Sequence, residues 1–464
     1  MNVNEIPPEL RDAGRVLPAL VAMVEKKAPY ASAALERTGG LQVVVNHREQ
    51  SVTEIPLSQG LILSAWNGAW LEEAATSDLE PDSIKTVAQR LAEAIQVSPG
   101  PAIDPGPVKQ SHFDTAFTED PRSLSAEQKL EMCRELHRTA SALDPRIVNV
   151  QVRYLERLES KAFVNRSKQL SQNVMRLRMS VQMFVSDGQQ LQYDWVSKDA
   201  TGGLELVRVS DDELRRLCAQ ALALLTAEKV PPGMYDVVCS PDVSGVIAHE
   251  AFGHGVELDM FLKGRARSQQ YLGKTIASPL VNILDDPSYP HGHGSYFFDD
   301  EGQLAAPTYI IRDGVFERGI SDLLSAHALG ATRSANGRRE SFEHKIYTRM
   351  SNTFFARGDT PVQDLIASVD HGVYLQHSSS GMEDPKGWGM QVTSHYGEEI
   401  RKGKLTGRIY SPIGITGYVP DILQSVSAVG EDFALSGGTC GKGHKEWVPV
   451  SSGGPHLKLK ARLG

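Results

Sequence analysis

The chain has little of what marks a membrane-spanning or secreted protein. Its 464 residues contain no uncharged apolar run of about 18 residues, so a membrane-spanning helix is not expected. The first residues, MNVNEIPPELRDAG, hold neither a basic segment nor an apolar stretch, which argues against a signal peptide. We therefore expect a cytoplasmic protein without membrane contact.

Cysteines are also few, and the chain has no excess of positive charge. The chain has only four cysteines, and their wide spacing argues against a disulfide framework: Cys133, Cys218, Cys239 and Cys440. Lys and Arg number 48 against 57 Asp and Glu, a formal net charge of -9, and the cationic residues are scattered. A nucleic-acid partner is therefore not expected.

What is present is enough apolar sequence, 41% of residues, to build more than one folded core. Most glycines follow residue 230, where helical periodicity becomes rare and Pro231-Pro232-Gly233 ends an amphipathic segment. We predict an α+β protein. A mixed α/β domain over residues 1–230 precedes a β-rich domain over residues 231–464 that carries one metal-binding helix.

The hydrophobic periodicity predicts individual elements. The expected helices cover residues 18–37, 83–96, 125–141 and 211–230. The expected strands cover residues 41–46, two or three antiparallel segments within 162–196, and 234–240. Residues 98–121, rich in Pro and Gly, are expected to form an irregular connection.

The strongest chemical signal is His249-Glu250-Ala-Phe-Gly-His254, at the start of the second domain. In the zinc-peptidase pattern HExxH, two His four residues apart share one helical face, and the Glu activates water. Here the spacing is five, which on an ideal helix turns about 500° and separates the two imidazoles. The helix must therefore deviate. A π-bulge at Gly253 would bring the second His back beside the first.

A catalytic zinc site needs a third protein ligand and an open position. Cys440 is the leading candidate, because it lies among glycines in SGGTCGKGH and a thiolate binds zinc well. The other candidates are histidines: His291, His293, His371, His377, His395 and His444. The remaining three cysteines fit buried positions on helices or a strand.

Four segments in this order, HEAFGHGVELD, FDDEG, RMSNT and GGTCGKGH, resemble the TldD/PmbA family of metalloproteases. The resemblance implies one zinc per chain, held by His249, His254 and Cys440, with Glu250 as the base. Because the full set is retained, the chain resembles the catalytic TldD-type member rather than its metal-free companion subunit. It also implies a dimer, with itself or with such a paralogue, and cleavage of unfolded proteins or peptide precursors. An older label connects the family to control of DNA gyrase, but this sequence contains no DNA-binding motif that would support such a role.

Three further residues are weaker candidates for substrate contact: His444, Arg349 and Asn352. FDDEG is more typical of a turn than of a metal site. His444 stands where the resemblance leads us to expect a Gln-like residue, and it could be a fourth ligand or an acid/base group. A closed four-ligand site would be structural, so a non-catalytic peptide-binding or assembly scaffold is the alternative function.

Overall fold

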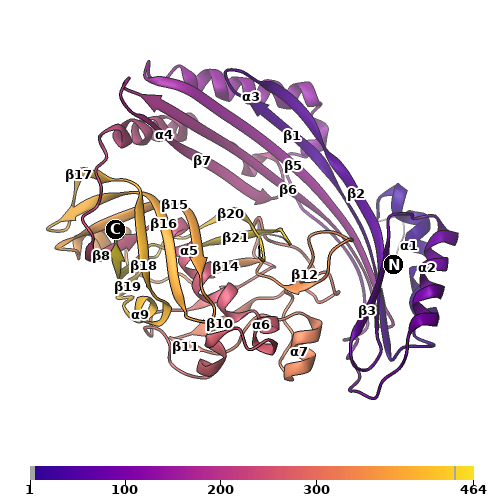
Figure 1. Cartoon of the computed structure of the whole chain (residues 1–464). Coiled ribbons are helices and arrows are strands. Elements are labelled where there is room, and N and C mark those ends of the chain that lie inside the picture. The colour runs from indigo at the N-terminus through magenta and orange to yellow at the C-terminus, as the bar shows by residue number, and fades with distance from the viewer. Residues whose placement is uncertain (1–5, 444–445) are drawn as a thin grey trace.

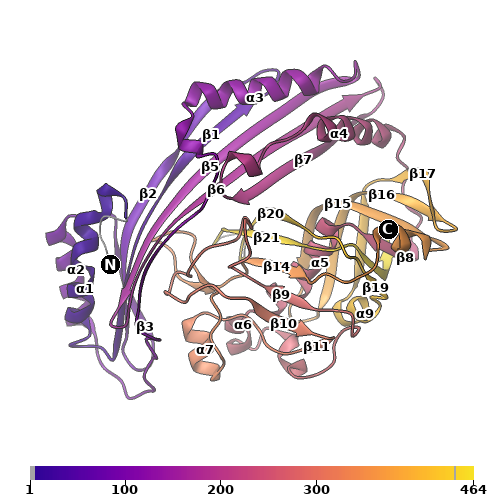
Figure 2. The same cartoon turned by 180° about the vertical axis from the view of Figure 1, so that it is seen from behind.

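The N-terminal half is dominated by one long, curved sheet that arches over the C-terminal half (Figures 1 and 2). The computed structural model describes residues 6–443 and 446–464. The sheet order is β3-β2-β1-β5-β6-β4, with β7 also paired to β6, and only the β4–β6 pair is parallel. Its strands are β1 (Tyr30–Val45), β2 (Gln50–Trp66), β3 (Leu71–Thr76), β4 (Lys109–Asp114), β5 (Ile147–Asn165), β6 (Lys168–Ser186) and β7 (Leu191–Thr201).

Four helices cover this sheet in two pairs. Side chains of α1 and α2 share a core with β1 and β2, and those of α3 and α4 share a second core with β5 and β6. Both α3 and α4 begin with a capping box, at Ser125 and Ser210, which explains their sharp N-termini. The helices are α1 (Arg11–Val24), α2 (Pro81–Ala94), α3 (Ala126–Ser141) and α4 (Asp211–Ala223).

Three sequence-based expectations for this half are wrong in part. The helix expected over residues 18–37 ends at Val24, and residues 30–37 belong to β1. There Ala33 and Leu35 pack toward α1 and α2, while Ala34 packs on the opposite face, so burial on both faces overrides the helical preference of alanine. The connection 98–121 contains β4, and α4 ends at Ala223 rather than at residue 230.

The core of the C-terminal half is formed by two sheets with helix α5 (Pro241–Phe252) buried between them. The first sheet has the order β11-β10-β9-β14-β21-β20, and the second β15-β8-β22-β18-β16-β17 with β19 beside β22. Helix α5 contacts strands of both sheets, and its residues are almost all buried. Within the described residues no helix is long and apolar enough to cross a membrane.

The strands of the first sheet are β9 (Ile283–Asp285), β10 (Thr308–Arg312), β11 (Val315–Phe316), β14 (Asn352–Phe355), β20 (Ala434–Cys440) and β21 (Val448–Gly454). Those of the second are β8 (Gly233–Cys239), β15 (His371–Glu383), β16 (Gly389–Arg401), β17 (Lys404–Tyr410), β18 (Ile413–Tyr418), β19 (Ala428–Val429) and β22 (Leu457–Leu463). Smaller elements of this half include the pair β12 (Gly337–Arg338) and β13 (Tyr347–Thr348), and the short helices α6 (Leu258–Leu262), α7 (Leu323–Leu329), α8 (Val362–Ala367) and α9 (Val419–Gln424).

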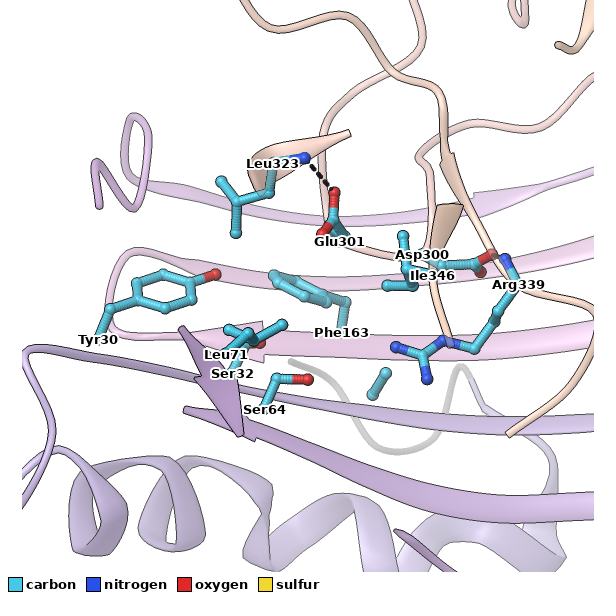
Figure 3. Close-up of a pocket in the computed structure, with 11 residues that line it drawn as sticks. Tyr30, Ser32, Ser64, Leu71, Phe163, Asp300, Glu301, Leu323, Arg339 and Ile346 are labelled. Atoms are coloured by element: carbon cyan, nitrogen blue, oxygen red, sulfur yellow. Dashed lines mark hydrogen bonds between the residues drawn. The ribbon is translucent and has the colours of Figure 1, made fainter. Parts of the chain in front are cut away.

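The FDDEG segment forms a turn against the N-terminal sheet, as expected for these residues. Gly302 has φ +70°, and a Cβ there would lie 2.3 Å from the ring of Phe163, so the close approach requires glycine. Glu301 accepts a hydrogen bond from the Leu323 amide at 2.6 Å (Figure 3). Burial raises the pKa of Glu301 to about 8. A carboxyl group that burial keeps largely protonated near neutral pH is therefore enclosed where the two halves meet.

Candidate metal centre

Helix α5 places the first two residues of the motif at the centre of the C-terminal half. Apart from His249 and Glu250, its sequence VSGVIAHEAF is small or apolar on every side, which suits a helix enclosed by two sheets. Gly245 permits this packing, because a Cβ there would lie 2.2 Å from the amide nitrogen of Gly453 in β21. Helix and strand therefore touch through their backbones, one turn before His249.

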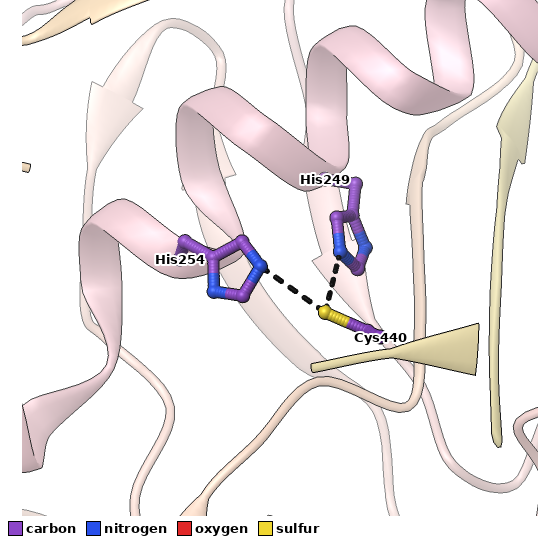
Figure 4. A group of neighbouring side chains, drawn as sticks. All are labelled: His249, His254 and Cys440. Carbon is purple, nitrogen blue, oxygen red and sulfur yellow. Dashed lines mark hydrogen bonds between the residues drawn. The ribbon is translucent and has the colours of Figure 1, made fainter. Parts of the chain in front are cut away.

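Three side chains that are far apart in the sequence meet beside this helix (Figure 4). The Cys440 Sγ atom, at the end of β20, lies 3.2 Å from His249 Nε2 and 3.1 Å from His254 Nε2. The two imidazole rings are perpendicular, with centroids 5.1 Å apart. Each residue thus directs one donor atom toward a common point.

The histidines converge in a different way from the π-bulge that the spacing suggested. Helix α5 ends at Phe252, and His254 begins a separate 3-10 turn, His254–Val256. Gly253 makes the transition, since a Cβ there would lie 2.3 Å from the His249 carbonyl oxygen. Only one of the two histidines is therefore on the helix, and the expectation of a single helix carrying both is wrong.

The three groups shift each other's protonation strongly. Burial alone would raise the pKa of the Cys440 thiol, but the adjacent imidazoles hold that pKa well below its usual range. Burial alone would lower the pKa of His249 and His254, but the thiolate raises both above the ordinary value. The site therefore favours a deprotonated sulfur, which is the form that binds metals.

Behind His254 lies a set of buried charges that sequence reasoning missed. Glu257 Oε2 lies 3.7 Å from His254 Nδ1 and 3.0 Å from Lys442 Nζ. Burial opposes ionisation of Glu257, yet Lys442, His254 and Arg349 lower its pKa to about 2. The ionised carboxylate faces the His254 ring from behind, as outer carboxylates do for metal-binding imidazoles. The position of Glu257, three residues after His254, was the feature of the sequence that could have indicated this carboxylate.

The centre opens into a cleft of about 1320 Å³. Glu250 lines this cleft together with the three donors. The N-terminal half also contributes to its walls, including Trp195 and Asp199 from β7 and Arg216 from α4. Those residues lie far before the motif in the sequence, and no local pattern indicated them.

Two predicted substrate contacts lie elsewhere. Arg349 is fully buried and donates from Nη2 to the Cys440 carbonyl at 2.9 Å, so it supports the backbone of β20. Asn352 is also fully buried and donates to the Asp286 carbonyl at 2.7 Å. Neither side chain lines the cleft. The third candidate, His444, lies outside the described residues.

The donor set fits a zinc ion. Tetrahedral zinc, with bonds of about 2.0–2.1 Å to nitrogen and about 2.3 Å to sulfur, holds such donors about 3.5 Å apart. The observed separations of 3.1 and 3.2 Å need only a small outward movement to reach that value. Two imidazoles and a thiolate also match the softness that zinc prefers over magnesium or calcium.

Comparison with known proteins identifies the family. Residues 232–462 match the PmbA/TldA metallopeptidase C-terminal domain, and residues 119–227 match the central domain of the same family. A protein from Methanothermobacter thermautotrophicus, named metalloprotease, is 32% identical over 434 residues, 92% of each chain. A TldD homolog metalloprotease from Haemophilus influenzae is 29% identical, covering 87% of this chain and 86% of that one.

Solved structures share the fold. A Thermotoga maritima protein, described as a candidate modulator of a DNA gyrase, superimposes with a TM-score of 0.79 at 18% identity, covering 96% of this chain and 99% of that one. TldE from Thermococcus kodakarensis gives 0.75 at 16% identity, covering 97% and 100%. With this shared fold, the sequence matches show that the chain belongs to the TldD/PmbA metallopeptidase family.

Proposed function

We propose that the chain is a zinc-dependent peptidase of the TldD type that hydrolyses amide bonds in unfolded proteins or peptide precursors. The observation that supports this most directly is the convergence of His249, His254 and Cys440 at a cleft that Glu250 also lines. Among the described residues three protein donors converge, which leaves a position open, as in catalytic rather than structural zinc sites.

A zinc ion bound there supplies a Lewis acid that polarises the scissile carbonyl and acidifies water. Glu250 is the general base that takes a proton from the attacking water and passes it to the leaving amine. His249 and His254 are held in place by the end of α5 and by Glu257, respectively. The enclosed position of Glu250 limits its contact with bulk water and keeps it beside the cleft.

The substrate is an extended peptide held through its main chain. Strand β20 lies at the edge of its sheet, and residues Ser378–Glu383 of β15 pair only with β16 on one side. Both segments line the cleft. Exposed strand edges bind an extended chain by main-chain hydrogen bonds and read few side chains, which suits unfolded substrates.

For assembly we propose a dimer, formed either by two copies of this chain or with a related subunit that lacks the metal motif. The family resemblance supports this proposal.

The test is cleavage of an unfolded casein-like substrate by purified protein with and without a chelator. Activity should be lost with the chelator and restored by zinc. Glu250→Gln should retain zinc and the folded state while turnover falls by at least about 10²-fold, because only proton transfer is removed.

Glu93→Gln, an exposed acidic position on α2, is the matched control and should behave as the unaltered protein. Near-normal turnover in Glu250→Gln would refute its role as base. An inert protein that holds zinc through four ligands would instead favour the scaffold function.

A further inference from the structure

A second group of metal-ligand side chains lies apart from the first centre. One donor atom each from Glu340, His344 and Glu446 falls within 4.8 Å of the others. Glu340 and His344 lie in the connection between β12 and β13, and Glu446 lies in the connection between β20 and β21. The Trp447 amide donates to Glu340 Oε2 at 3.0 Å, which joins the two connections.

The histidine of this group has one nitrogen available. His344 Nδ1 lies 2.8 Å from Ser341 Oγ, and His344 Nε2 lies 3.8 Å from Glu340 Oε2. When Nδ1 donates to the serine hydroxyl, Nε2 carries the lone pair and faces the carboxylate. A hydrogen bond from the other ring nitrogen is the usual way in which a metal-binding imidazole is oriented.

The glutamate from the β20–β21 connection is the least satisfied member. Glu446 is only 7% exposed, and its Oε2 atom has neither solvent contact nor a hydrogen-bond partner among the described residues. Among the residues that the structure describes, no lysine or arginine forms an ion pair with Glu340 or Glu446. Burying a carboxylate oxygen without a partner is strongly unfavourable, and a bound cation would remove that cost.

The nearby arginines are engaged elsewhere. Arg349 donates to the backbone carbonyls of Glu446 and Cys440, and its Nε lies 3.5 Å from Glu257. Arg339 donates to the His344 carbonyl at 3.0 Å and to Glu73 at 3.3 Å. These two guanidinium groups therefore serve other partners and do not neutralise the carboxylates of the second group.

We propose that Glu340, His344 and Glu446 form a second divalent transition-metal site with two carboxylates and one imidazole as ligands. Two oxygen donors and one nitrogen donor suit Mn²⁺ as well as Zn²⁺, whereas the thiolate centre favours zinc. The bound ion would hold together two connections, one of which follows Cys440 directly. Arg349 links the Glu446 and Cys440 carbonyls, so the second site is joined through the backbone to the first.

The difference in donors provides the experiment. Full-length protein is first supplied with one equivalent of Zn²⁺, and Mn²⁺ is then titrated while electron paramagnetic resonance follows the free aqua ion. We expect one further equivalent of Mn²⁺ to bind. Glu446→Gln and His344→Gln should each weaken that binding at least about tenfold, because each removes one of three ligands.

Two control variants show whether Mn²⁺ binds at this second group. Glu343→Gln changes an exposed acidic residue on the same connection and should leave Mn²⁺ binding unchanged. His249→Ala disables the first centre and, when titrated without the prior Zn²⁺ addition, should also still bind Mn²⁺. His344 and Glu340 are partly exposed, so variants there should fold normally even if Glu446→Gln does not. The proposal is overturned if Mn²⁺ fails to bind, if His249→Ala abolishes the binding, or if Glu343→Gln weakens it as much as His344→Gln.

Discussion

Adding one methyl group at Gly245 should damage the metal centre without touching a ligand. The Cβ of Gly245→Ala would lie 2.2 Å from the amide nitrogen of Gly453 and 2.5 Å from its Cα, whereas ordinary contacts begin at 3.4 Å. Helix α5 and strand β21 would therefore have to separate by about 1 Å, because close-packed backbone cannot absorb the overlap.

That separation acts on both sides of the centre. His249 lies one helical turn after Gly245, and β21 is hydrogen-bonded along its length to β20, which ends at Cys440. A metal constellation tolerates errors of about 0.5 Å. We therefore expect the dissociation constant for zinc to rise about 10- to 100-fold, as for other substitutions that displace ligands indirectly.

The stability of the folded protein should also fall. Alanine is favoured over glycine inside a helix by about 1 kcal/mol, but overpacking costs typically about 1–3 kcal/mol, and a backbone partner cannot move aside as a side chain can. Competition with a chromophoric chelator measures the affinity, and thermal denaturation measures the stability. Gly389→Ala is the matched control, because its Cβ would meet nothing within 4 Å. A Gly245→Ala protein with a raised melting temperature and zinc affinity within about twofold of normal would refute the reasoning.

Three other outcomes are expected. Cys440→Ala should bind zinc at least about tenfold more weakly, whereas His444→Ala should keep one zinc per chain by elemental analysis; equal loss in both would indicate a closed structural site. Because burial raises the pKa of Glu301 from 4.5 to about 8, its contribution to stability is fully present below pH 4.5 and is lost as pH rises through 8. Thermal denaturation between pH 4.5 and 8 should show this loss of stability, and in Glu301→Gln the loss should be smaller by an amount on the order of 1 kcal/mol or more. The same pH dependence in both proteins would contradict the raised pKa of Glu301. Light scattering should show a dimer, alone or with a metal-free paralogue, and a stable, active monomer would exclude it.

Local chemistry allowed much of the candidate centre to be found from the sequence. His249, Glu250 and His254 share one short motif, and the glycines around Cys440 indicated a backbone that a metal could approach closely. The spacing of five also required a break in the helix. It did not specify the kind of break, because a 3-10 turn and a π-bulge both satisfy the same spacing.

The parts that the sequence did not reveal depend on tertiary packing. Residues 30–37 contain three alanines and read as helix, but they form a strand because α1 and α2 bury one face and the C-terminal half buries the other. The cleft walls from β7 and α4 depend on how the arched sheet lies over the second half. Arg349 was a candidate for substrate contact, whereas its guanidinium supports the backbone carbonyls of Cys440 and Glu446.

The distance along the chain between the donors has a consequence for biosynthesis. Cys440 follows His249 by 191 residues. At about 5–20 residues per second, a ribosome adds the cysteine roughly 10 to 40 s after the first histidine. During that interval the nascent chain has two of the three donors, and β20 and β21 are absent from the side of α5. The cluster of three donors is therefore completed only after β20 has been synthesised, so the residues before β20 emerge from the ribosome without a finished metal centre beside them.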